Sequence, residues 1–188
     1  MTADPDPTPD EQKAHSHVRG VEHIGITVPD HDAALAFFQD AFGAEILFSH
    51  TDTAGGPIHG RDVGAKNGLP ADRAMAKVSM LRLKNGPNIE IFEIDRPEGQ
   101  PGTDIVFLGI SHFSVNVSDI GRAAEAFRAA GGTMLSSPYD LGPPERAEGN
   151  RGVFGRAPWG LLIEMEQLPG PMDYASGARS TRWQPDGG

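Results

Sequence analysis

Hydrophobic and polar residues alternate along two short stretches of this chain, and the two stretches are copies of each other. In Val21 to Asp30 (VEHIGITVPD) three aliphatic residues fall on one face of an extended chain, and His23 falls on the other. Ile110 to Asp119 (ISHFSVNVSD) repeats this pattern at an offset of 89 positions, so His112 occupies the position equivalent to His23. Each copy predicts a half-buried strand that carries a histidine on its polar face.

The apolar period lengthens after each copy, as expected for a helix. Asp30 and Asp119 end the two stretches, and the carboxylate of each can accept backbone N–H groups at the start of a helix. We therefore predict helices over about 31–42 and 119–130. Their inward residues are predicted to be Ala34, Leu35, Phe38 and Ala41 in the first helix, and Ile120, Ala123, Phe127 and Ala130 in the second.

Further strands complete two βαβββ modules, so the predicted fold class is α+β. The strands are expected at 20–28, 44–49, 76–83, 88–94, 109–117, 133–136, 152–156 and 161–167, with a hairpin turn at Asn85-Gly86. The glycine-rich segment 50–72 is predicted to be a long loop. His59, Arg61, Lys66 and Asn67 in this loop are candidates for contact with an anionic substrate, and a solvated surface is the competing interpretation.

The rest of the chain divides around these modules. Residues 1–18 are rich in proline and aspartate and are predicted to be a disordered tail. The first module is expected at 19–96, a linker at 97–108, the second module at 109–168 and a C-terminal extension at 169–188. Tyr174 and Trp183 suggest that the extension packs on the domain.

Net charge and amino-acid composition exclude several classes of partner and site. The formal net charge of −10 disfavours partners that need a basic face, such as nucleic acid or an anionic membrane. The absence of cysteine excludes disulfides, thiolate catalysis and zinc–thiolate sites. No apolar run approaches the length of a membrane span and no signal-peptide pattern is present, so we expect a soluble cytoplasmic protein.

Each module also ends in a strand with a central glutamate. Glu90 lies in NIEIFEI and Glu164 in LLIEMEQ, and strand alternation places each carboxylate opposite its apolar neighbours. If these faces converge with those of His23 and His112, two imidazoles and two carboxylates meet. Each of the four is also acceptable as an ordinary structural polar group. His31, His50 and His59 lie outside this pattern.

Such a ligand set suits a divalent metal ion. Two carboxylates balance its charge, and nitrogen and oxygen ligands without sulfur fit Mn, Fe, Co, Ni or Zn. An octahedral ion would keep two positions for adjacent substrate oxygens and would act as a Lewis acid on a carbonyl group. One of the glutamates could then move a proton.

These motifs, in this order over residues 20–167, resemble the vicinal oxygen chelate superfamily. That superfamily includes glyoxalase I, methylmalonyl-CoA epimerase, extradiol dioxygenases, and fosfomycin and bleomycin resistance proteins. The resemblance implies paired curved mixed sheets around a metal cleft and metal ligands at His23, Glu90, His112 and Glu164. It also implies a small-molecule substrate and favours Glu164 over Glu90 as the catalytic base, and we expect a homodimer.

Departures from the relatives affect the predicted reaction. Thr27 stands where glyoxalase I commonly has an arginine that helps to bind glutathione, and Glu90 stands where methylmalonyl-CoA epimerase usually has glutamine. We favour proton transfer next to a metal-held carbonyl, as in an isomerase, epimerase or glyoxalase-type lyase. An Fe(II) ring-cleaving dioxygenase is the first alternative, although it uses only two histidines and one carboxylate. A non-catalytic binding or resistance protein is the second.

Overall fold

The computed structural model describes residues 21–49, 56–97, 110–174, 176 and 181–182. The predicted tail at 1–18, most of the predicted linker, His15, His17, His50 and Trp183 lie outside these described residues. The first module contains β1 (His23–Val28), α2 (His31–Phe42), β2 (Glu45–Ser49), β3 (Ile58–His59), α3 (Gly60–Asn67), β4 (Ala74–Arg82) and β5 (Asn88–Ile94). The second contains β6 (His112–Asn116), α4 (Ile120–Ala129), β7 (Thr133–Met134), β8 (Tyr139–Asp140), β9 (Arg151–Arg156) and β10 (Leu162–Gln167).

The two modules have the same sheet topology. The strand order is β1-β5-β4-β2 in the first sheet and β6-β10-β9-β7 in the second, and a short strand adds to each sheet outside this path. The first two strands of each path run parallel, and the others pair antiparallel. The predicted pair of βαβββ modules is therefore confirmed.

Both long helices begin where the aspartates predict. The Asp30 carboxylate accepts the backbone N–H of Ala33, and the Asp119 carboxylate accepts that of Arg122. Gly43 ends α2 in a left-handed conformation with φ 64°, which glycine adopts without steric strain. The predicted helix bounds hold to within about one residue, as helix ends usually do.

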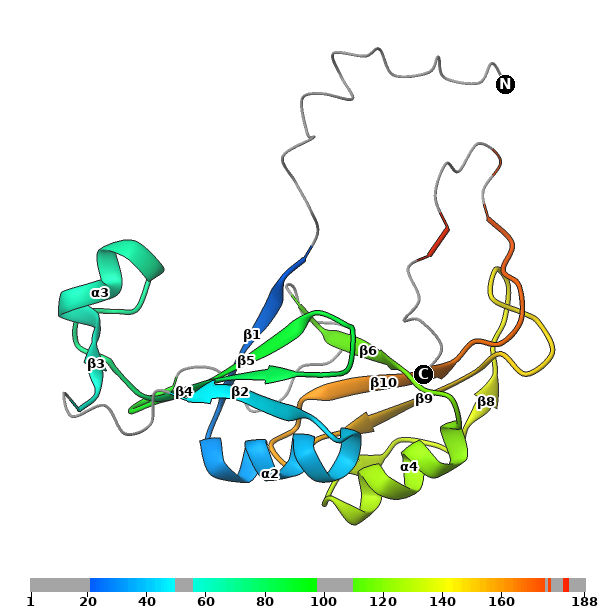
Figure 1. Ribbon diagram of the computed structural model, residues 1–188, viewed down its shortest axis with the longest axis horizontal. Helices are drawn as coiled ribbons and strands as arrows, with labels where there is room; N and C mark the ends of the chain where they lie inside the picture. Colours follow the sequence, from blue (N-terminus) through cyan, green and yellow to red (C-terminus); the bar gives the residue numbers. More distant parts are fainter. Residues whose placement is uncertain (1–20, 50–55, 98–109, 175, 177–180, 183–188) are drawn as a thin grey trace, which may run out of the picture.

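One continuous core joins the modules within the chain. The helices α2 and α4 lie on the same side of the two sheets and pack against each other (Figure 1). Phe38 and Phe127, which the repeat places at equivalent positions, are both fully buried. The ring of Phe37 lies edge-on to that of Phe127, with 5.2 Å between the ring centroids.

The predicted inward faces of the helices need a correction. Phe37 and Ala124 are buried, whereas Leu35 and Ala123 are only partly buried. A helix that packs on a sheet alone buries a single stripe of residues. Because α2 and α4 also pack on each other, each helix buries a second line of residues.

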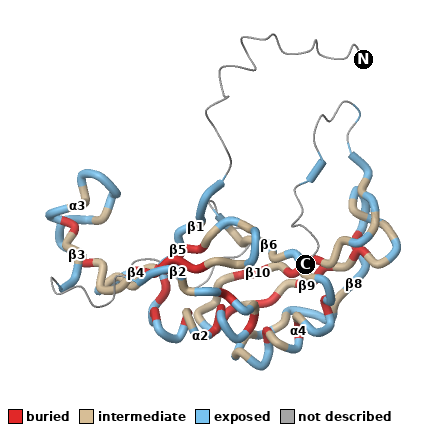
Figure 2. The backbone as a smooth tube through the Cα atoms, viewed as in Figure 1, coloured by how far each residue is buried: buried red, intermediate tan, exposed pale blue. Residues whose placement is uncertain are grey.

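The segment predicted as a long loop contains β3 and α3, so this part of the prediction was wrong. The glycines of this segment favoured a loop in the prediction, but in the structure they allow close packing of the helix. A Cβ on Gly60 would lie 1.9 Å from the carbonyl oxygen of Pro70, and a Cβ on Gly64 would lie 2.1 Å from the carbonyl oxygen of Leu69. Helix α3 extends away from the sheets, and Gly60 is its one buried residue (Figure 2). No helix of the described residues is long and apolar enough to cross a membrane.

Candidate metal centre

The first histidine and glutamate lie side by side on the open face of the first sheet. Ile89 and Ile91 of β5 are buried in the core, so Glu90 between them points to the face opposite the helices. In the parallel pairing of β1 with β5, Gly25 is opposite Glu90 and His23 is two residues back. His23 Nε2 lies 3.5 Å from Glu90 Oε2.

The second module repeats this pair. Ile163 and Met165 are buried, so Glu164 of β10 faces away from the helices. Ser114 is opposite Glu164 in the parallel pairing of β6 with β10, and His112 is again two residues back. His112 Nε2 lies 3.6 Å from Glu164 Oε2. The equal register and nearly equal distance show that the two pairs occupy corresponding places in the repeat.

The residue before each histidine fixes the orientation of its ring. His23 Nδ1 donates to Glu22 Oε2 at 2.5 Å, and His112 Nδ1 is hydrogen-bonded to Ser111 Oγ at 2.9 Å. The Phe154 ring packs edge-on to His112, with 5.3 Å between centroids. With Nδ1 occupied, Nε2 is the nitrogen that faces the glutamate, which is how outer partners orient a metal-binding histidine.

Negative charge gathers around the second pair. Burial, with the charges of Glu166 and Glu145, raises the pKa of Glu164 to about 7, although the charge of Arg182 acts to lower it. In the first pair, the hydrogen bond that His23 donates to Glu22 holds the pKa of His23 above its usual value, and the charge of Glu90 adds to this. A cation at these positions would relieve the repulsion around Glu164.

The four predicted residues are brought together as two pairs. Among the residues that the structure describes, no three histidine, aspartate or glutamate side chains gather closely enough to hold a metal ion. The spacing of the donor atoms in each pair still suits a metal ion. Neighbouring ligand atoms of an octahedral ion with bonds of ~2.1 Å lie about 3 Å apart, and the nitrogen–oxygen distances in the two pairs exceed this by roughly 0.6 Å or less. Convergence of all four side chains on one ion stays a prediction.

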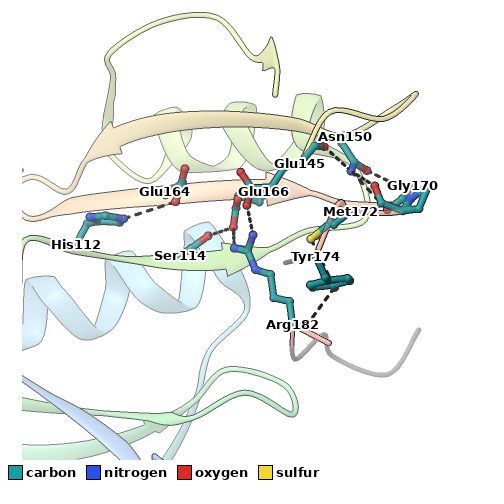
Figure 3. Close-up of polar contacts among 11 residues, drawn as sticks. His112, Ser114, Glu145, Asn150, Glu164, Glu166, Gly170, Met172, Tyr174 and Arg182 are labelled. Atoms are coloured by element: carbon teal, nitrogen blue, oxygen red, sulfur yellow. Dashed lines mark hydrogen bonds and ion pairs between the residues drawn. The ribbon is translucent and has the colours of Figure 1, made fainter. Parts of the chain in front are cut away.

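Sequence reasoning missed several polar residues of the second module (Figure 3). Glu166 follows Glu164 by two residues and so lies on the same face of β10, where Ser114 Oγ donates to it at 2.8 Å. Tyr139 lies near both: burial raises its pKa, and the charges of Glu164, Glu166 and Glu145 add to this. The second glutamate of LLIEMEQ was a visible signal for Glu166, whereas nothing in the sequence indicated that Arg182 contacts it.

Other residues singled out from the sequence lie elsewhere. His59 ends β3, and Arg61, Lys66 and Asn67 belong to α3, which extends away from the sheets that carry the paired histidines. His31 is fully buried, with Nε2 hydrogen-bonded to Ser79 Oγ at 2.8 Å, so it is a structural residue of the core.

The chain belongs to the Glyoxalase/Bleomycin resistance protein/Dioxygenase superfamily, whose model matches residues 20–165. A glyoxalase family protein from Bacillus cereus has the same fold, with a TM-score of 0.63 at 18% identity over 80% of this chain and 94% of that chain. The fosfomycin resistance protein FosX from Listeria monocytogenes gives a TM-score of 0.51 at 18% identity over 80% of this chain and 93% of that chain.

Two relatives in sequence are epimerases. The 2-epi-5-epi-valiolone epimerase from Actinomyces sp. is 32% identical over 178 residues, which is 89% of this chain and 89% of the relative. The ethylmalonyl-CoA/methylmalonyl-CoA epimerase from Cereibacter sphaeroides is 28% identical over 152 residues, which is 79% of this chain and 97% of the relative. Family, fold and relatives thus support a vicinal oxygen chelate enzyme with epimerase relatives.

Proposed function

We propose that this protein is a metal-dependent epimerase that inverts a carbon next to a carbonyl group by proton transfer. The observation that carries the proposal is the pair of His–Glu contacts, one in each module at the same strand register. Epimerisation removes a proton from one side of a carbon and returns one to the other side. Two carboxylates supplied by related modules suit that task.

His23, Glu90, His112 and Glu164 would hold the metal ion. When bound, a divalent cation supplies Lewis-acid chemistry, since it draws negative charge toward the carbonyl oxygen of the substrate. Mn, Fe, Co, Ni and Zn are the candidates that the nitrogen and oxygen donors fit.

Glu164 is our candidate for the base. The substrate C–H bond breaks, its proton goes to the Glu164 carboxylate, and the electron pair moves toward the neighbouring carbonyl. Without metal the pKa of Glu164 is raised to about 7, mainly by burial. A carboxylate bound to a cation is a weaker base, so Glu164 would act as the base when a chelating substrate displaces it from the metal. Glu90, at the related position of the first module, is the candidate that starts protonated and gives its proton to the opposite side of the carbon. Exchange with water would then remove the proton from Glu164 and return one to Glu90.

The names of the two relatives supply the candidate substrates. One is 2-epi-5-epi-valiolone, a polyhydroxylated cyclic ketone, and the other is an ethylmalonyl-CoA or methylmalonyl-CoA thioester. Both compounds have a carbon next to a carbonyl group, which is the carbon that the proposed reaction would invert.

A substrate assay tests the proposal. Purified protein of measured metal content is incubated with each compound, and the epimers are followed by NMR with and without a chelator and with and without oxygen. We expect one compound to epimerise without oxygen consumption, to stop with chelator and to recover with added metal. Oxygen uptake with ring cleavage would instead support a dioxygenase, and binding without turnover by metal-loaded protein would support a sequestering protein.

A further inference from the structure

The two modules differ at the positions that neighbour their glutamates. Gly25 of β1 and Ser114 of β6 occupy equivalent positions in the repeat. The residue two places after each glutamate is Phe92 in the first module and Glu166 in the second. A Cβ on Gly25 would lie 3.2 Å from the Phe92 ring, and Ser114 Oγ lies 2.8 Å from Glu166 Oε2. The same diagonal contact is therefore apolar in one module and polar in the other.

The chain after β10 completes the polar contact. Arg182 binds Glu166 with one guanidinium nitrogen and Glu145 with the other (Figure 3). Only 4% of Glu166 is exposed, so a charged group on the open face of the sheet is almost buried. A carboxylate in such a place needs a partner, and Ser114 and Arg182 provide two.

Backbone contacts hold this part of the chain in place. The buried Asn150 accepts the backbone N–H of Gly170 at 2.7 Å, and the backbone N–H of Asp173 donates to the carbonyl of Pro144 at 2.9 Å. The backbone N–H of Arg182 donates to the Tyr174 hydroxyl at 3.1 Å. Arg182 is thus held by a backbone contact with Tyr174 as well as by the contacts of its guanidinium group.

We propose that the exposed Ser114 binds a substrate hydroxyl group, that Arg182 and the buried Glu166 are the residues that position Ser114 for this, and that the substrate is a neutral polyhydroxylated ketone. The inference rests on the proposed epimerase function. Because Ser114 donates its proton to Glu166, its oxygen is left to accept a hydrogen bond from a sugar-like hydroxyl. Gly25 and Phe92 would meet the less polar side of the substrate, so the asymmetry selects one binding orientation.

The charges favour this substrate over a CoA thioester. Arg182 is the cation in the contact, and its charge is shared by Glu145 and Glu166, with Glu164 close by. Such an acidic surface would repel the phosphates of CoA, whereas neutral hydroxyl groups would not be repelled.

The test compares kinetic constants for three variants. Arg182→Ala and Ser114→Gly should each raise KM for the cyclic ketone by about tenfold, as expected when a hydrogen bond to a charged group is lost. Arg182→Lys should recover part of the loss, and metal content per chain should stay at the parent value. Arg122→Ala is the matched control, because this arginine is on the exposed surface of α4.

Three outcomes would overturn the inference: an unchanged KM in both Arg182→Ala and Ser114→Gly, an equal rise in KM for an acyl-CoA thioester, or loss of bound metal. A second measurement separates this from the proposed function. Saturation-transfer NMR with myo-inositol, a cyclic polyol that has no carbonyl to react, reports binding even if the parent protein turns over neither substrate. A signal that weakens in Arg182→Ala supports the hydroxyl-binding role, and a signal equal to the parent's contradicts it.

Discussion

Replacing Glu164 with glutamine should stabilise the metal-free protein, and the gain should grow as the pH rises. The folded protein holds the pKa of this carboxyl at about 7, above its ordinary value of 4.5. Between these values the folded state binds more protons than the unfolded state, so the free energy of unfolding falls as pH rises through this window. Glutamine has no proton to lose, so Glu164→Gln removes that fall.

The size of the effect follows from the pKa difference. It is 7 − 4.5 = 2.5 units, and at ~1.4 kcal/mol per unit this sets a ceiling of about 3.5 kcal/mol. Because solvent reaches part of the site, we expect about 1–2 kcal/mol.

The assay is urea unfolding in the presence of a chelator at several pH values from about 4.5 to 8. The difference in unfolding free energy between Glu164→Gln and the parent should increase up to pH ~7 and then level off. Glu125→Gln, on the exposed surface of α4, controls for the loss of a carboxylate. A difference that stays constant over the whole range would refute the reasoning. Adding metal should stabilise the parent more than the variant, since the variant lacks one proposed ligand.

The remaining predictions concern the core, the helix caps and the metal. Phe127→Ala should lower the free energy of unfolding by about 3–5 kcal/mol in denaturant titrations, since it opens a cavity between helix and sheet; a loss below about 1 kcal/mol would contradict the core position. Asp30→Ala and Asp119→Ala should each lose about 1 kcal/mol in the same titrations, and no change in either would argue against capping. Elemental analysis should find about one divalent transition metal per parent chain and much less in His112→Ala, where full occupancy would refute the ligand role.

The repeat explains why so much of the fold could be predicted. Alternation around His23 and His112 indicated two equivalent strands, and the capping aspartates fixed where the helices begin. These are local signals that the chain carries within about ten residues. The packing of Phe37 on Phe127 was not predictable in this way, because it depends on how two distant helices meet.

The site was predictable only in part for the same reason. Glu90 and Glu164 could be placed on the polar face of their strands from alternation alone, and the structure brings each beside its histidine. The contact of Arg182 with Glu166 joins the end of the chain to β10 and leaves no periodic pattern in the sequence. Helix α3 was missed because its glycines, read as breakers, serve close packing on Leu69 and Pro70.

Solvent deuterium incorporation tests the central claim most directly. The parent protein, loaded with metal and given an epimerisable substrate in D2O, should place deuterium on the carbon that is inverted. Glu164→Gln should do so slower by a factor on the order of 10²–10⁴, as expected when a general base is removed. Equal deuterium incorporation by parent and variant would contradict the role of Glu164. Turnover that needs oxygen and places no deuterium would contradict proton transfer altogether.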